Sequence, residues 1–133
     1  MIVGIQPVAG GGPALVDQTW LNGVANGQNQ SFVNGLVAHA GGTKAAALQI
    51  PAGVAIAIFA TVATTGDSAL LPQAKQRNTL KVYNAGAQTI DLYGRGTDTV
   101  NQVATATAYT LTAGQAAEFF CGVDGNWSAI KSA

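Results

Sequence analysis

Glycine, proline and small polar residues interrupt this chain so often that few segments are long enough for a helix. Seventeen glycines and four prolines are spread over 133 residues, in short clusters with Asn, Thr and Ser. Helices need longer uninterrupted stretches, whereas strands of about five or six residues fit between such turns. The sequence therefore predicts an all-β protein with roughly eight to ten short strands.

The segment of residues 79–93 has the pattern of a β-hairpin, with two alternating runs on either side of a glycine-containing loop. Pairing across that loop would place Val82 opposite Ile90 on one face and Lys81 opposite Asp91 on the other. Because apolar and charged residues would both find suitable partners, we expect these two runs to be neighbouring antiparallel strands.

A second hairpin is predicted over residues 118–131. Asp124-Gly125 at its centre favours a type I′ turn, which matches the twist of paired strands. Counting back from that turn pairs Phe119 with Ile130. We therefore expect residues 118–123 and 126–131 to form the last two strands of the domain.

Large and small apolar residues alternate in residues 54–58, so a strand here would place Val54, Ile56 and Ile58 on one face and alanines on the other, with both faces covered. The adjacent residues Phe119 and Phe120 must also point to opposite faces of their strand. One of the two phenylalanines, or Trp127, is therefore expected to meet a neighbouring layer and not water. Such strands are typical of a packed sandwich or barrel.

The length of the chain fits one domain, and its first residues differ from the rest. Pro7, Pro13 and the glycine run at residues 10–12 favour neither a helix nor a continuous strand. We therefore predict an extended arm over residues 1–16 and a single jelly-roll, sandwich or small-barrel domain over residues 17–133.

Charge is scarce in this chain. Charged residues make up 9% of the sequence and the formal net charge is zero, whereas an ordinary domain has about 25% charged residues. Nothing in this composition attracts nucleic acid or an anionic membrane surface, so neither is an expected partner. The most apolar stretch, residues 54–63, is half as long as a membrane-spanning helix. The first residues lack the pattern of a secretory signal, so synthesis in a cytoplasm is expected.

Residues able to perform catalysis or hold a metal are equally scarce. His39 is the only histidine and Cys121 the only cysteine, so a disulfide within the chain and a cysteine cluster are excluded. His39 could in principle join Ser31, Ser68 or Ser128, but no nucleophile motif surrounds these serines. We predict that the protein is not an enzyme and has no metal site and no cofactor, although a metal shared at a symmetry axis stays open.

The aromatic residues allow two interpretations. A sugar-stacking platform could use the following residues: Trp20, Trp127, Tyr83, Tyr93 and Tyr109. In the structural interpretation, Trp127 covers Gly122 across the second hairpin and Trp20 anchors a loop. Because only 7% of the residues are aromatic, we expect the core to use them first.

Several of these motifs occur together in one known group of proteins. They are Val82–Gly86 (VYNAG), Leu92–Tyr93, the loop Gly94–Asn101, Leu111–Gly114 (LTAG), Glu118–Phe119 and Asp124–Trp127 (DGNW). The run that contains them resembles the carboxy-terminal half of small structural proteins of tailed bacteriophages, namely head decoration or cement proteins and related head-fibre domains. The upstream segments DQTWLNGVANGQN and LQIPAG are similar to such proteins too, but Gly94-Arg95 stands where the pattern has a proline.

The resemblance implies a jelly-roll or tulip-like subunit, usually a homotrimer, that binds the outside of a capsid. Its partners would be the major capsid protein and other copies of itself, and its location would be the virion exterior. Its function would be to stabilise the expanded shell. The alternative within the same group of proteins is a receptor- or glycan-binding domain of a phage fibre or spike.

The contact with the capsid or with a sister subunit is expected in the amino-terminal arm and at its nearest aromatic anchor. The residues predicted for this contact are Ile2, Val3, Ile5, Pro7, Val8 and Trp20. An apolar arm with few charges gains stability when it is covered by a partner.

Overall fold

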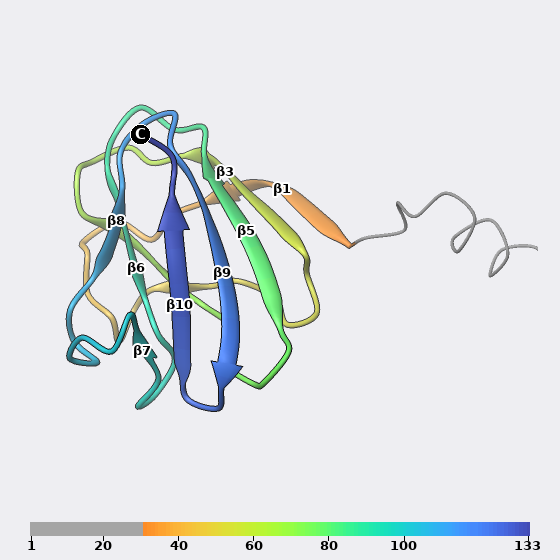
Figure 1. Ribbon diagram of the computed structural model, residues 1–133. Coiled ribbons are helices and arrows are strands. Elements are labelled where there is room, and N and C mark those ends of the chain that lie inside the picture. Colours follow the sequence, from red (N-terminus) through yellow and green to blue (C-terminus); the bar gives the residue numbers. More distant parts are fainter. Residues whose placement is uncertain (1–30) are drawn as a thin grey trace, which may run out of the picture. The chain divides into compact units, whose positions relative to one another are not determined.

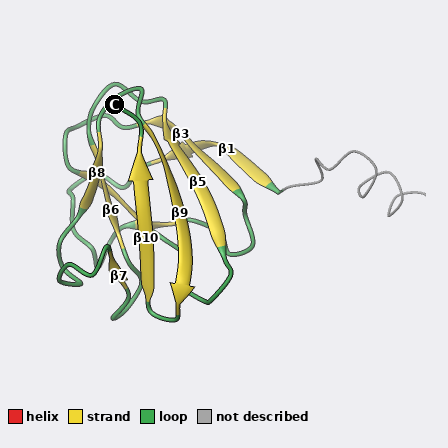
Figure 2. Ribbon diagram, viewed as in Figure 1, coloured by secondary structure: helices red, strands yellow, loops and turns green. Residues whose placement is uncertain are grey.

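The computed structural model describes residues 31–133, and this part of the chain is built from strands and loops (Figure 2). The strands are β1 (Phe32–Val37), β2 (Leu48–Gln49), β3 (Ile56–Thr61), β4 (Asp67–Leu70), β5 (Thr79–Asn84), β6 (Ile90–Tyr93), β7 (Thr99–Val100), β8 (Tyr109–Leu111), β9 (Ala116–Val123) and β10 (Asn126–Lys131). The all-β prediction is confirmed. The predicted arm, residues 1–16, and the first residues of the predicted domain lie outside the described residues.

The strands form a β-solenoid of about four turns, so the prediction of a jelly-roll sandwich or barrel is wrong (Figure 1). The chain alternates between two sheets as it advances. Strands β1, β3 and β5 lie side by side and parallel in one sheet, and β2, β4 and β6 do so in the other. A jelly roll is made of antiparallel strands, whereas here each turn up to β6 adds a parallel strand to each sheet.

The last four strands complete the two sheets. Strand β8 pairs antiparallel with β6, and β9 pairs antiparallel with β5. Strand β10 then pairs with β9, and the short β7 lies parallel to β10 at the edge. The result is a six-stranded sheet in the order β1-β3-β5-β9-β10-β7 and a four-stranded sheet in the order β2-β4-β6-β8.

The hairpin predicted over residues 79–93 does not form, because β5 and β6 belong to different sheets. The segment between them is a corner of the solenoid, held by the buried side chain of Asn84. Its amide nitrogen donates to the carbonyl oxygens of Gln88 (2.7 Å) and Leu111 (2.9 Å), and its amide oxygen accepts from the N–H of Gly86 (2.9 Å). A Cβ at Gly86 would lie 2.5 Å from the backbone nitrogen of Val62, so the corner packs directly on the previous turn.

The hairpin predicted over residues 118–131 is confirmed, with a different register. Strands β9 and β10 are joined by Asp124-Gly125, and a β-bulge follows the turn. The bulge shifts the pairing by one residue, so Ile130 lies opposite Glu118 and not opposite Phe119. A type I′ turn needs a positive φ at both of its central residues. Gly125 has φ +89°, but the φ of Asp124 is not positive, so the turn is not type I′.

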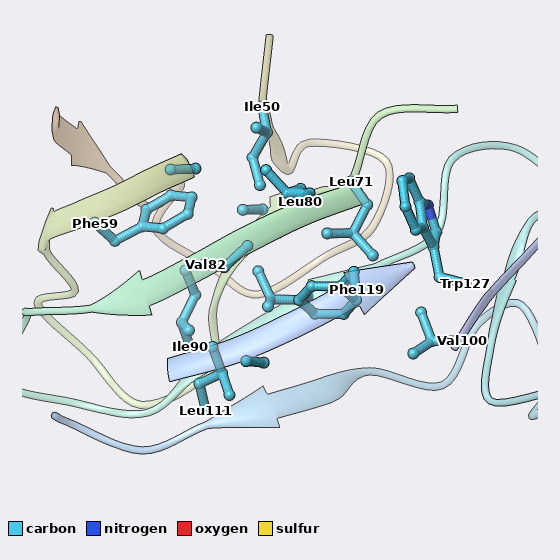
Figure 3. Packing of buried hydrophobic residues seen from close by; sticks show 14 of the residues in the cluster. Ile50, Phe59, Leu71, Leu80, Val82, Ile90, Val100, Leu111, Phe119 and Trp127 are labelled. Atoms are coloured by element: carbon cyan, nitrogen blue, oxygen red, sulfur yellow. The ribbon is translucent and has the colours of Figure 1, made fainter. Parts of the chain in front are cut away.

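The core lies between the two sheets (Figure 3). The largest fully buried side chains come from both sheets and from the connections between them: Trp127, Phe119, Phe59, Ile50, Leu71, Leu80, Ile90, Leu92 and Leu111. Trp127 is only 1% exposed, and its indole N–H donates to the carbonyl oxygen of Pro72 (3.1 Å). Nothing lies within 4 Å of a would-be Cβ at Gly122, so the interpretation that Trp127 covers Gly122 is wrong. In residues 31–133 no helix has the length and apolar character needed to cross a bilayer.

Candidate functional site

The six-stranded sheet has one face in the core and one face that residues 31–133 leave uncovered. We call the second one the exposed sheet face. It is formed by the outward residues of β1, β3, β5, β9 and β10: Phe32, Ile56, Ile58, Thr79, Lys81, Tyr83, Ala116, Glu118, Phe120, Ser128 and Ile130. Four of its large side chains are well exposed, namely Ile130 (65%), Phe32 (62%), Phe120 (41%) and Tyr83 (39%).

The strand register aligns five of these residues in one row across the sheet. Phe32 lies beside Ile56, Ile56 beside Lys81, Lys81 beside Glu118, and Glu118 beside Ile130. Neighbouring strands are about 4.8 Å apart, so adjacent side chains of such a row are within reach of one another. The two charged residues stand at the centre of the row, and apolar residues flank them on both sides.

The same face carries a shallow depression over strands β5, β9 and β10, with a volume of about 380 Å³. It is lined by Lys81, Ala116, Ala117, Glu118, Ile130, Lys131 and Ser132. Lys131 at its border donates to the carbonyl oxygen of Thr110 (2.9 Å) and lies over the ring of Tyr109. The depression exists because the outward side chain of Ala116 is small while its neighbours are long.

The outer face of the four-stranded sheet is covered by the chain itself over β4 and β6. Residues 38–47, which we call the covering loop, run from β1 to β2 and contact this face. The hydroxyl groups of Ser68 and Tyr93 donate to the carbonyl oxygens of Thr43 (3.2 Å) and Gly42 (3.2 Å). Lys44 holds the far side of the loop by donating to the carbonyl oxygens of Gly96 (2.7 Å) and Thr105 (3.0 Å). Leu70 and Tyr93 are both buried, although neither belongs to the central core cluster.

Two carboxylates line a pocket of about 390 Å³ beside the covering loop. Asp67 is buried and structural, because its carboxylate accepts hydrogen bonds from the N–H groups of Ala63 (3.1 Å) and Thr64 (3.0 Å). Burial raises the pKa of Asp91 above its ordinary value. Burial and the nearby Asp91 charge together raise the pKa of Tyr93.

The other candidate groups of the sequence have structural positions. His39 is exposed and pairs through its backbone with Ser68, whose hydroxyl donates to the carbonyl of Thr43. Cys121 is a buried thiol next to the carbonyl of Val123. Among residues 31–133, no three His, Cys, Asp or Glu side chains are close enough together to hold a metal ion.

The residues predicted for the capsid or intersubunit contact, namely Ile2, Val3, Ile5, Pro7, Val8 and Trp20, lie outside the described residues. The structure does place the other aromatic residues proposed for sugar stacking. Trp127 and Tyr93 are buried, whereas Tyr83 is exposed on the six-stranded sheet, so these three do not share one surface.

Only part of the exposed sheet face could be predicted from the sequence. The alternation in residues 54–58 correctly predicted that Ile56 and Ile58 share one face and Ala57 lies on the other, and Phe119 and Phe120 do point to opposite faces. The sequence did not predict that Ile56 and Ile58 lie on the outward face of the sheet. That these residues lie on one face with Phe32 and Ile130 depends on the strand order, which local alternation does not contain.

Comparison of the chain with protein-family models, with characterised proteins and with solved structures finds no match.

Proposed function

We propose that this protein is a structural component of a tailed-phage virion. In this proposal it binds the major capsid protein on the outside of the head as an oligomer, with a homotrimer as the expected form, and it stabilises the expanded shell. It is a binding protein without a reaction of its own. The resemblance of the motifs in residues 79–130 to head decoration proteins is the origin of the proposal.

The exposed sheet face is the observation that carries the proposal. Proteins that remain alone in solution rarely leave a large contiguous apolar patch uncovered, and such patches mark contacts with other proteins. Here Phe32, Phe120 and Ile130 are exposed on one sheet, in a chain with only 9% charged residues. A chain with so few charged residues suits a subunit whose surface is covered on assembly.

The stabilisation would follow from mass action. A protein that binds the expanded shell and not its precursor lowers the free energy of the expanded form at every occupied site. At a free concentration about one hundred times the Kd, the gain is about 2.7 kcal/mol per site. Summed over the many equivalent sites of a capsid, this gain opposes the outward pressure of packaged DNA.

The direct test is to mix the full chain with emptied, undecorated capsids and measure bound protein against its free concentration. Saturable binding, with a rise in the temperature at which the capsids disassemble, is the expected result. Absence of binding at every concentration would contradict the proposal. So would turnover of a substrate by the purified chain.

A truncated chain tests the predicted role of the arm. Removal of residues 2–13 should abolish capsid binding and leave the β-sheet circular dichroism signal unchanged. Unchanged binding would show that the arm is not the contact. Binding of a saccharide by the intact oligomer, in place of the capsid, would favour the receptor-binding alternative.

A further inference from the structure

We propose that the exposed sheet face joins copies of this chain to one another, around a rotation axis that runs along the strands above the boundary between β5 and β9. The β3–β5 half of the face in one copy would then contact the β9–β10 half in the next. The inference rests on the oligomer of the proposed function and adds to it the surface and the pairs of residues that make the contact.

The symmetry fixes which residues would meet. A rotation about an axis parallel to the strands keeps each residue at its height along the strands and brings one half of the face against the other half in the next copy. A residue of β5 in one copy therefore meets its own cross-strand neighbour from β9 in the next copy. Residues of β3 meet residues of β10 in the same way. The pairs can be read from the strand register.

The central pair is complementary in charge. Lys81 of β5 and Glu118 of β9 are cross-strand neighbours at the middle of the face, and both are exposed. Around the proposed axis, Lys81 of one copy faces Glu118 of the next, and its own Glu118 is available to Lys81 of a further copy. Every such contact joins opposite charges, which sets the register between copies.

The next pair in the same row joins two apolar residues. Ile56 lies beside Lys81 on one side, and Ile130 lies beside Glu118 on the other. The rotation brings Ile56 of one copy against Ile130 of the next, so the exposed Ile130 gains an apolar partner. These apolar contacts flank the charged pairs and exclude water from them.

The rows above and below are complementary in size. Tyr83 lies beside Ala116 in one row, and Phe120 lies beside Thr79 in the other. In the proposed contact each large aromatic ring meets the small residue of the neighbouring copy. The ring of Tyr83 enters the depression that Ala116 and Glu118 line. Large against small residues is the arrangement of a well-packed interface.

The opposite orientation lacks this complementarity. A two-fold axis across the strands, at the height of Lys81, would keep each residue in its own strand position. Lys81 would then meet Lys81 and Glu118 would meet Glu118, and like charges at the centre of an interface oppose association. The charges at the centre of the face therefore favour copies with their strands parallel.

Two charge-reversal variants of the full chain test the inference, with molecular mass in solution measured by analytical ultracentrifugation. Lys81→Glu and Glu118→Lys each place like charges in every contact, so each variant alone should associate on the order of tenfold more weakly, or worse, than the natural chain. Lys75→Glu is the matched control, because Lys75 is an exposed residue of the connection before β5, and its reversal should leave the mass unchanged.

Mixing the two variants separates contacts between copies from effects within one chain. In a mixed oligomer the glutamate introduced at position 81 of one variant faces the lysine introduced at position 118 of the other. Most contacts then again join opposite charges, and the mass should recover. Mixing cannot repair a defect inside a single chain. If either variant alone keeps the natural mass, or if the mixture stays dissociated, the inference is wrong.

Capsid binding distinguishes failure of this inference from failure of the proposed function. The chain could be a monomer at every concentration, or its mass could be unchanged by both charge reversals. If it still binds emptied capsids, the inference is overturned and the proposed function stands. A chain that associates as described but does not bind emptied capsids would support the inference and overturn the proposed function.

Discussion

The outer faces of the two sheets differ in how far residues 31–133 cover them. Strands β4 and β6 of the four-stranded sheet are covered by residues 38–47, whose backbone carbonyls accept hydrogen bonds from Ser68 and Tyr93. The six-stranded sheet carries exposed Phe32 and Ile130 with nothing from residues 31–133 over them. Residues 31–133 thus cover part of one outer face and leave the other uncovered, and the uncovered face is the one that we propose joins copies of the chain.

The sharpest form of this contrast is found within one strand, at two adjacent phenylalanines. Phe119 is 0% exposed and packs edge-to-face on Tyr109 and Trp127, whereas Phe120 is outward. Phe119→Ala should lower the free energy of unfolding by about 3–5 kcal/mol, because it removes a ring from the core and leaves a cavity. Urea denaturation followed by circular dichroism measures this change.

The matched variant is Phe120→Ala, which should change the free energy of unfolding of the isolated chain by less than about 1 kcal/mol. Its effect should appear as a lower mass in solution instead. Equal losses of stability for Phe119→Ala and Phe120→Ala would show that both faces of β9 are packed inside the molecule and would remove the contrast.

A second substitution tests the contrast at the covering loop of the four-stranded sheet. A Cβ at Gly42 would lie 2.5 Å from the carbonyl oxygen of Gly66, and the φ of Gly42 is +64°. Gly42→Ala should therefore displace the covering loop, with a loss of about 2 kcal/mol or more and increased binding of an apolar dye to the uncovered sheet.

Gly41→Ala is the control for this substitution. Gly41 also has a positive φ, +103°, but nothing lies within 4 Å of its would-be Cβ. Only the backbone strain should remain, at about 1 kcal/mol, without dye binding. If the two alanine variants behave alike, close contact with Gly66 does not hold the loop.

A smaller effect is expected when a single hydrogen bond of the covering loop is removed. Tyr93→Phe keeps the buried ring and deletes the hydroxyl that donates to the carbonyl of Gly42. We expect a loss of about 0.5–1.5 kcal/mol in the free energy of unfolding, and faster hydrogen exchange confined to residues 38–47. Unchanged exchange in that loop would contradict the assigned contact.

The smallest expected effect concerns the carboxylate beside the loop. Burial raises the pKa of Asp91 in the folded state above its unfolded value, so the folded state binds this proton more readily. The free energy of unfolding should therefore fall as pH rises from the ordinary carboxyl range through the raised pKa. Asp91→Asn should remove that part of the pH dependence in urea denaturation from about pH 3 to about pH 7. An identical pH profile for both proteins would contradict it.

The strand segments and one of the two predicted hairpins could be predicted from the sequence, whereas the strand order could not. The turn at Asp124-Gly125 joins two strands in direct contact, so its hairpin could be predicted from the turn residues. Alternation likewise identified which side chains share a face of a strand. Neither signal tells which strand lies beside which, because that depends on contacts distant in sequence.

The corner at Asn84 shows why the fold class was missed. The segment NAG between two alternating runs has the composition of a hairpin loop, but its Asn side chain is used to carry the chain from one sheet to the other. The available signal was spacing: β1, β3 and β5 begin at Phe32, Ile56 and Thr79, which are 24 and then 23 residues apart. Since the letters of these turns differ, no repeat is visible in the sequence itself.

Thiol labelling measures most directly whether the exposed sheet face is covered in the assembled protein. Thr79→Cys places a thiol on that face beside Phe120, and Thr97→Cys places one in an exposed loop between β6 and β7. The natural Cys121 is buried and gives a low background. We expect the thiol at position 79 to react much more slowly in the concentrated oligomer than in the diluted chain, while the thiol at position 97 reacts equally fast in both. Equal rates at position 79 in the two samples would contradict a covered sheet face.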